Sequence, residues 1–154
     1  MPAERERDEV ALAFFAVRRT QDQEGYIGAI LVIDNHGIPK EFRCTHPVRP
    51  TLVQKALYGN NLERHIGFEL CGKPLLAELT SDPVACLVET TRMLGLREAV
   101  QLPVIHVQRL GDLLGVSAQS DQESGGRIER LESEVNNFQP LAAHCYAGFE
   151  TDIE

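Results

Sequence analysis

The sequence lacks any long hydrophobic run: its longest apolar stretch, from Ile27 to Ile33, has seven residues and includes a glycine. A membrane-spanning helix needs about 20 mostly apolar residues, so we expect none. The first residues are of mixed charge and lack the basic-then-apolar order of a secretory signal. We therefore predict a cytoplasmic protein that makes no contact with a membrane.

A basic stripe is missing as well. Fifteen basic residues stand against 23 acidic ones, which gives a net charge of -8, and the only adjacent basic pair is Arg18-Arg19. Because phosphate contacts by Lys and Arg dominate affinity for nucleic acid, the composition predicts no nucleic-acid partner. The acidic excess lies in residues 119–154, which carry eight acids and two bases. Such an acidic end either stays solvated or docks on a partner.

Cysteine pairs and glycine-rich loops are absent too. The chain has four widely spaced cysteines without a C-x-x-C pair: Cys44, Cys71, Cys86 and Cys145. Without a secretory signal they are expected to be reduced thiols. Gly59 and Gly72 are placed as helix ends, and neither belongs to a phosphate-binding loop. The sequence thus predicts neither a disulfide framework nor a nucleotide loop.

What the sequence does contain is the pattern of one globular domain of 154 residues. A continuous apolar run at Tyr26–Asp34 predicts a buried strand. Asn35-His36-Gly37 predicts a turn into a second, antiparallel strand at Pro39–Val48. Thr51 and Gln54 have the spacing of a capping box, so a helix is expected to begin there.

Val10–Val17 predicts a buried strand or the last part of a short helix, and further strands are predicted at Val84–Glu89 and Pro103–Val107, with helices between the later ones. This order predicts an α/β fold: a three-layer sandwich with a mixed sheet, in which an N-terminal antiparallel hairpin is followed by helical crossovers. The same order occurs in ribonuclease-H-like domains and, with fewer leading strands, in deaminase-like and JAB-like domains. Fold order of this kind carries no function by itself.

The domain organisation follows from composition. The globular α/β domain is placed at residues 9–116, a polar linker at 117–126 and an acidic tail at 127–154. Within the tail, four apolar residues have the spacing of a short amphipathic helix and are the candidate partner-binding residues: Ile128, Leu131, Val135 and Phe138. They either dock on a partner or pack back on their own domain.

The catalytic patterns of the related folds are not matched. Ribonuclease-H-type nucleases place a carboxylate in the middle of the first strand, whereas Val10–Val17 contains no acid. Zinc deaminases need H-x-E and P-C-x-x-C, and both are missing. The segment from Cys44 through His46 to Pro47 is similar to the H-x-H-P element of JAB-type metalloproteases, without the acid that should follow. We therefore name no catalytic and no cofactor-binding residue.

A zinc site is the one metal centre that the residue types allow. Cys44 and His46 form a C-x-H pair on one strand face, and His144 with Cys145 provides a later pair, giving two thiolates and two imidazoles. The alternative is that Cys44 belongs to the core and the others to the polar surface. Thiol catalysis by Cys44 is disfavoured, because His46 lies about 7 Å further along a strand.

The stretch from Gly28 to Gly59 resembles a bacterial family of uncharacterised proteins. Its members carry a strand hairpin, then E-F-x-C-T-x-P-V-x-P and then Q-x-x-L-Y-G, which stand here at residues 41–50 and 54–59. The resemblance implies a bacterial, self-standing domain and brings no activity with it.

Two functional hypotheses remain from the sequence. The first is a non-catalytic subunit or adaptor in a bacterial assembly, which binds a protein partner or itself through the acidic tail. The alternative is a zinc-dependent hydrolase or a zinc-stabilised domain built on the four Cys and His residues.

Overall fold

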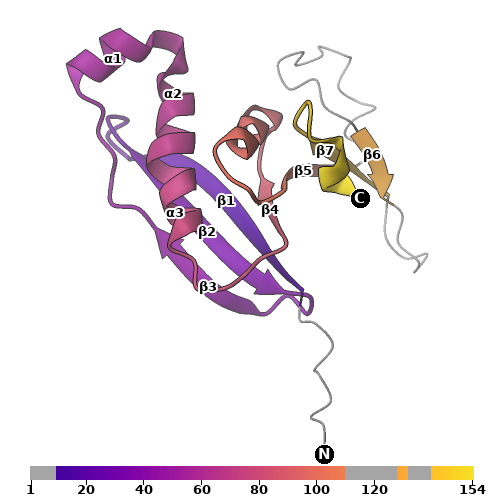
Figure 1. The fold of residues 1–154 in the computed structure, drawn as a ribbon. Helices are drawn as coiled ribbons and strands as arrows, with labels where there is room; N and C mark the ends of the chain where they lie inside the picture. The colour runs from indigo at the N-terminus through magenta and orange to yellow at the C-terminus, as the bar shows by residue number, and fades with distance from the viewer. Residues whose placement is uncertain (1–9, 110–127, 132–139) are drawn as a thin grey trace, which may run out of the picture.

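The computed structural model describes residues 10–109, 128–131 and 140–154. In these residues the chain forms a seven-stranded mixed sheet with the order β3-β2-β1-β4-β5-β7-β6 (Figure 1). The strands are β1 (Ala11–Arg19), β2 (Tyr26–Asp34), β3 (Pro39–Cys44), β4 (Ala85–Val88), β5 (Val104–Arg109), β6 (Ile128–Leu131) and β7 (Leu141–Cys145).

The direction of the strands confirms the predicted α/β class. β2 is antiparallel to both of its neighbours, β1 and β3, whereas β4 and β5 run parallel to β1. The parallel strands are reached through helical crossovers, because a chain can join parallel neighbours only by returning along the sheet. The mixed sheet, its N-terminal antiparallel hairpin and the helical crossovers are therefore as expected.

The first crossover contains most of the helical residues. It consists of α1 (Leu52–Tyr58), a 3-10 turn (Gly59–Asn61), α2 (Leu62–His65), a π-helical segment (Ile66–Gly72) and α3 (Lys73–Ala77). The predicted capping box is confirmed, since the Gln54 amide donates to the Thr51 hydroxyl at 3.1 Å and the Thr51 amide donates to the Gln54 side chain at 2.9 Å. A 3-10 helix at Thr91–Glu98 forms the second crossover.

Gly72 is not the helix end that the sequence predicts. The helix continues into α3, and a Cβ on Gly72 would lie 2.8 Å from a methyl group of Leu96. The absence of a side chain therefore allows two helical segments to pack closely. The π-helical segment precedes Pro74, which has no N–H to donate to the preceding turn, so the wider turn accommodates the proline within the helix.

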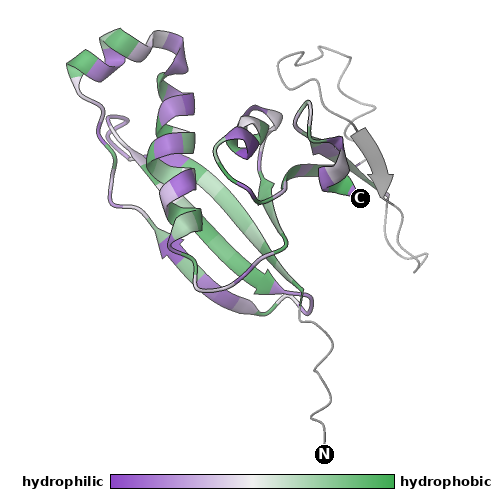
Figure 2. Ribbon diagram, in the orientation of Figure 1, coloured by the Kyte–Doolittle hydropathy of each residue, from purple (hydrophilic) through white to green (hydrophobic). Residues whose placement is uncertain are grey.

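The core lies between the sheet and the crossover helices. Alternate side chains of each strand point toward these helices, and Phe15, Ile30 and Val32 are almost fully buried there. Figure 2 shows the apolar character of the central strands beneath the helices. Leu94 and Leu96 of the 3-10 helix complete the same cluster.

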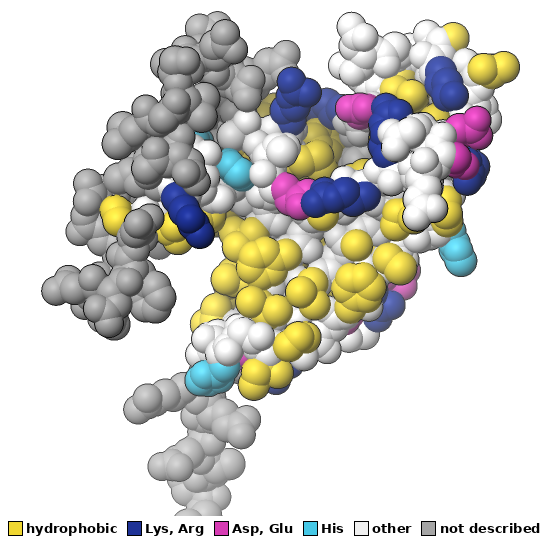
Figure 3. All heavy atoms as spheres, turned by 180° about the vertical axis from the view of Figure 1, so that it is seen from behind, with side chains coloured by type: hydrophobic (Ala, Val, Ile, Leu, Met, Phe, Trp, Pro, Cys, Tyr) yellow, Lys and Arg dark blue, Asp and Glu magenta, His cyan; other side chains and the backbone are white. Residues whose placement is uncertain are grey.

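The opposite side of the sheet, which we call the open face, also carries apolar side chains. Strand register places Phe42, Leu31, Phe14 and Leu87 in one row across β3, β2, β1 and β4. Phe42 is 64% exposed and Phe14 is 39% exposed. Figure 3 shows an apolar area on this side of the molecule, and the helices of the described residues lie on the other side (Figure 1).

The predicted amphipathic tail helix is wrong where the structure describes it. Ile128 and Leu131 belong to strand β6, which pairs with β7, and β7 pairs with β5. The sheet therefore continues past the boundary predicted at residue 116. Apolar residues three apart fit a helix, but pairing with a distant strand supplies hydrogen bonds that local spacing does not reveal. Val135, Phe138 and the linker 117–126 lie outside the described residues.

Among the helices of the described ranges, none has both the length and the apolarity needed to cross a bilayer.

An acid-sensitive contact joins the sheet edge to the end of the first crossover. Glu41 of β3 accepts hydrogen bonds from the Thr80 amide at 2.8 Å, the Ser81 amide at 3.1 Å and the Arg43 side chain at 2.9 Å. These donors, with the Thr80 amide foremost, lower the pKa of Glu41 from 4.5 to about 2. The contact stabilises the fold fully above pH 4.5, and this stabilisation is lost as the pH falls toward 2.

We therefore expect Glu41→Gln to remove part of the loss of stability that the protein shows between pH 4.5 and 2, while it lowers the melting temperature at pH 7. The measurement is the melting temperature as a function of pH. Glu78→Gln, at an exposed position on the same crossover, is the matched control and should reproduce the native pH profile. Parallel profiles for native protein and Glu41→Gln would contradict the assignment.

Candidate functional site

The topology creates a crevice at the carboxyl ends of β1 and β4. These neighbouring strands are parallel, and the chain leaves β1 toward β2 on one side and β4 toward β5 on the other. In open α/β sheets such a change of direction leaves space for a ligand outside the strand ends. A cavity of about 750 Å³ opens on this side of the molecule and is lined by residues that follow β4 and residues of the first crossover.

The lining of this crevice is polar and carries two arginines. Arg64 of α2 lies over the ring of Phe68, with 5.2 Å from the guanidinium carbon to the ring centre. Arg92 is exposed, and no carboxylate of the described residues forms an ion pair with it. Uncharged hydrogen-bonding groups lie between the arginines: the amides of Asn60 and Asn61 and the hydroxyls of Thr90 and Thr91.

Glu63 lines the crevice and Glu89 lies beside it, and each of these carboxylates is paired with an arginine from the end of β1. Arg18 binds both oxygens of Glu89 through its two terminal nitrogens. The hydrogen bonds from Arg18 hold the pKa of Glu89 below its ordinary value. Arg19 contacts Glu63 at 2.9 Å. Both pairs are solvent-exposed, so their contribution to folding is small and their main effect is to orient the arginines.

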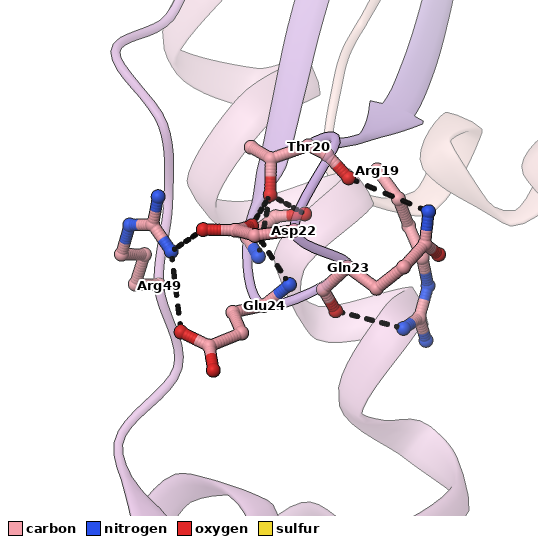
Figure 4. A network of polar contacts seen from close by, with 7 residues as sticks. Arg19, Thr20, Asp22, Gln23, Glu24 and Arg49 are labelled. Carbon is pink, nitrogen blue, oxygen red and sulfur yellow. Dashed lines mark hydrogen bonds and ion pairs between the residues drawn. The ribbon is translucent and has the colours of Figure 1, made fainter.

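The turn between β1 and β2 holds Arg19 in place (Figure 4). Asp22 accepts hydrogen bonds from Thr20, from the Glu24 amide at 3.1 Å and from Arg49 at 2.8 Å. These contacts, led by the Thr20 hydroxyl, lower the pKa of Asp22 to about 2. Arg19 in turn donates to the Gln23 carbonyl at 3.2 Å, so the turn and α2 hold the guanidinium from two sides.

A second cavity, of about 420 Å³, adjoins the crevice and shares Asn61 and Arg64 with it. The rings of Tyr58 and His65 line this cavity and stack with their centres 4.1 Å apart and their planes 11° from parallel. The stacked rings give this cavity a flat aromatic wall, and its charged lining residues are Arg64, Glu69 and Glu98.

The structure does not assemble the predicted zinc site. Cys44 ends β3, and His144 and Cys145 lie in β7, with β2, β1, β4 and β5 between the two strands. Five strand spacings correspond to about 24 Å, far beyond the distance that a shared zinc ion allows. His46 is exposed beyond the end of β3. In the described ranges no group of three or more Cys, His, Asp or Glu side chains could hold a metal ion.

His144 instead lies next to His106, a contact that the sequence did not suggest. Their ring centres are 5.5 Å apart, His106 contacts the Val88 carbonyl at 3.0 Å, and His144 contacts Gln108 at 3.1 Å. Burial, and then the nearby charge of His106, lower the pKa of His144. The pair joins β5 to β7 and therefore belongs to the sheet.

The four thiols differ sharply in accessibility. Cys44 is exposed, whereas Cys71, Cys86 and Cys145 are buried. Burial raises the pKa of Cys86 to about 12 and also raises that of Cys71. We expect a disulfide reagent such as DTNB to modify one thiol in the folded protein at pH 8 and four after unfolding. Cys44→Ser should abolish the native reaction, and rapid modification of several thiols would contradict this arrangement.

A two-metal nuclease centre does not fit the described residues either. β1 contains no carboxylate, as the sequence already showed. The two carboxylates in and beside the crevice, Glu63 and Glu89, are paired with Arg19 and Arg18. This donor set does not provide the cluster of carboxylates that a pair of divalent cations requires, so we derive no metal-dependent step.

These features define a mixed α/β sheet with an arginine-lined crevice at its topological switch point. Comparison with protein-family models gives no match, and comparison with the sequences of curated proteins gives none. Among solved structures, endonuclease V of Ciona intestinalis in complex with an inosine-containing 24mer DNA is 12% identical with a TM-score of 0.48, over 95% of this chain and 77% of that chain.

Two further solved structures also have low sequence identity to this chain. Endonuclease V of Bacillus subtilis is 11% identical with a TM-score of 0.49, over 89% of this chain and 64% of that one. An Argonaute of Marinitoga piezophila in complex with guide RNA is 8% identical with a TM-score of 0.36, over 97% of this chain and 25% of that one.

The predicted function and partners differ from what the names of these structures state. The structures that this chain is similar to are endonucleases and an Argonaute, which conflicts with a non-catalytic adaptor devoted to protein–protein interaction. Several are complexes with DNA or RNA, which conflicts with the predicted exclusion of nucleic acid. The part of the chain that forms most of the sheet is close to neutral, since residues 10–109 carry 11 basic and 10 acidic residues.

Few features of the sequence indicate which residues line the crevice. Arg64 and Arg92 are isolated in the sequence, and their convergence depends on the two crossovers. The available signal was the Arg18-Arg19 pair at a strand end, together with the near-neutral charge of the middle of the chain.

Proposed function

We propose that this protein binds nucleic acid through its phosphodiester backbone, and that the crevice at the carboxyl ends of β1 and β4 is the binding site. The observation that carries the proposal is the lining of this crevice of about 750 Å³, which contains Arg64, Arg92 and several amide and hydroxyl side chains, and whose one carboxylate, Glu63, is paired with Arg19. Phosphate and sugar oxygens are bound in proteins by these same side-chain types.

The geometry of arginine favours a phosphate ligand. A guanidinium offers several N–H donors in a planar fork that matches two phosphate oxygens. Arg92 has no competing carboxylate among the described residues, and Arg64 approaches Glu98 only at 3.9 Å. Both guanidinium groups are therefore available to an anion, while Glu63 and Glu89 remain neutralised by Arg19 and Arg18.

The test is fluorescence anisotropy of a labelled 20-nucleotide DNA or RNA strand titrated with the full chain at several salt concentrations. We expect binding at low salt that weakens as salt rises. Arg92→Ala should weaken binding about three- to tenfold for all sequences and reduce the salt slope by about 1, because one phosphate contact is lost.

Lys55→Ala is the matched control, since it removes one positive charge from exposed α1 without touching the crevice. It should leave binding within twofold of the native value. Absence of binding at low salt, or equal losses in Arg92→Ala and Lys55→Ala, would exclude the crevice as the site. Denaturing gels of the same mixtures, with and without Mg²⁺, show whether the strand is also cut.

We place this activity in the cytoplasm as part of the same proposal. Four cysteines that form no disulfide suit a reducing cytoplasm. The E-F-x-C-T-x-P-V-x-P and Q-x-x-L-Y-G segments support kinship with the bacterial family that they resemble.

A further inference from the structure

The open face has a hollow that the crevice does not account for. A cavity of about 370 Å³ lies over β2, β1 and β4. Its floor contains Ala16 and Ala29, which face each other across the β1–β2 pair. Phe14 of β1 and Phe42 of β3 stand two residues away from this small-residue floor, in the neighbouring row across the sheet.

The floor and its walls have different chemistry. Two alanines leave a flat depression, and Phe14 and Phe42, which are 39% and 64% exposed, border it with aromatic rings. Exposed aromatic rings on a sheet surface are a common platform for unstacked nucleobases. The lining is mainly apolar, with Glu89 as its one charged residue among the described side chains.

A positive charge stands at the edge of the hollow. Arg18 follows Ala16 by two residues on β1, so its side chain emerges on the same face about 7 Å further along the strand. Its contacts with Glu89 and the Val17 carbonyl use only its two terminal nitrogens. The Nε–H and one further N–H remain for an anion, and the side chain is 67% exposed.

The hollow and the crevice are lined by successive residues at the end of β4. Glu89 lines the hollow, and the next residue, Thr90, lines the crevice. A strand whose backbone lies in the crevice can therefore continue past Arg18 toward the open face. Figure 3 shows the apolar area bordered by a paired acidic and basic side chain.

We propose that this hollow binds an unpaired nucleobase, with the adjoining phosphate on Arg18, and that the ligand of the protein is therefore single-stranded. This inference rests on the proposed function and names its substrate class. A base inside a duplex cannot reach the floor, because its faces are covered by its neighbours and its edge by its partner. An aromatic border with a cation beside it fits a base and its phosphate better than it fits an aliphatic protein surface.

The test compares a labelled 20-nucleotide single strand with the duplex of the same sequence, at low salt, by fluorescence anisotropy. We expect the single strand to bind more tightly. Phe42→Ala and the hollow-filling Ala16→Leu should each weaken single-strand binding about tenfold, which is within the range for loss of one stacked base. Neither variant should change the weaker binding of the duplex.

Ile38→Ala is the matched control for Phe42→Ala, because Ile38 is also apolar and 54% exposed but does not line the hollow. It should bind the single strand as the native protein does. Melting temperatures of all variants identify any that fail to fold, and Ala16→Leu provides a second test that adds side-chain volume instead of removing it.

The outcomes separate the two proposals. If single strand and duplex bind equally, and only Arg92→Ala weakens them, the crevice is a binding site and the base site is wrong. If neither binds, the proposed function fails, and the base site fails with it. A chain that elutes as a dimer, becomes monomeric on Phe42→Asp and binds no oligonucleotide would show that a second copy covers the open face.

Discussion

Replacing Phe15 by alanine is expected to lower the free energy of unfolding by about 3–5 kcal/mol, the range for removing a buried phenylalanine. Phe15 is 1% exposed and lies in the cluster between the sheet and the crossover helices. Its neighbour Phe14 points to the open face and is 39% exposed. Phe14→Ala removes the same ring from the neighbouring residue. It should lower the free energy of unfolding by only about 1 kcal/mol, because the Phe14 side chain buries less apolar area than the Phe15 side chain does.

Urea denaturation followed by circular dichroism measures both values under the same conditions. The pair is a matched comparison, since the chemical change is identical and only the sheet face differs. Equal losses in the two variants would mean that the open face is covered in solution. Phe14→Ala should in addition weaken single-strand binding, whereas Phe15→Ala should affect binding only through stability.

The close contact between β2 and the crossover helices makes Gly28 the second sensitive position. A Cβ on Gly28 would lie 2.6 Å from the Cβ of Cys71 and 3.3 Å from a methyl group of Leu75. A contact this short forces the π-helical segment away from the sheet. We expect Gly28→Ala to lower the free energy of unfolding by about 1–3 kcal/mol, the usual range for overpacking.

Ala29→Val is the control, because it adds more volume at the next residue but on the open face. Its effect on stability should remain within about 0.5 kcal/mol, as for a surface substitution. A Gly28→Ala protein as stable as the native one would show that the helix can move from β2 without loss, contrary to the packing described here.

Local signals in the sequence account for the parts of the fold that were predicted correctly. The hairpin of β2 and β3 follows from an apolar run and a second, mostly polar strand segment on either side of a turn at Asn35-His36-Gly37. The start of α1 follows from Thr51 and Gln54, whose reciprocal hydrogen bonds span three residues. In both cases the interacting groups are close in sequence, so a short sequence pattern is enough to predict the contact.

The wrong predictions concern groups that are distant in sequence. β6 and β7 join the sheet through pairing with β5, which spacing along residues 128–138 does not encode. The predicted zinc ligands looked complementary in type, yet five strand spacings separate Cys44 from the β7 residues His144 and Cys145. Strand order depends on the whole set of packing choices, and no local pattern records it.

The candidate site divides in the same way. By itself the sequence determined a globular α/β chain, the hairpin of β2 and β3, and an arginine pair at the end of β1. Only the tertiary structure decided that Arg64 and Arg92 meet at the switch point between β1 and β4 and that a hollow opens behind Phe14 and Phe42. The crossovers bring the crevice residues together and strand register brings the hollow residues together, and neither kind of contact is recorded in local sequence spacing.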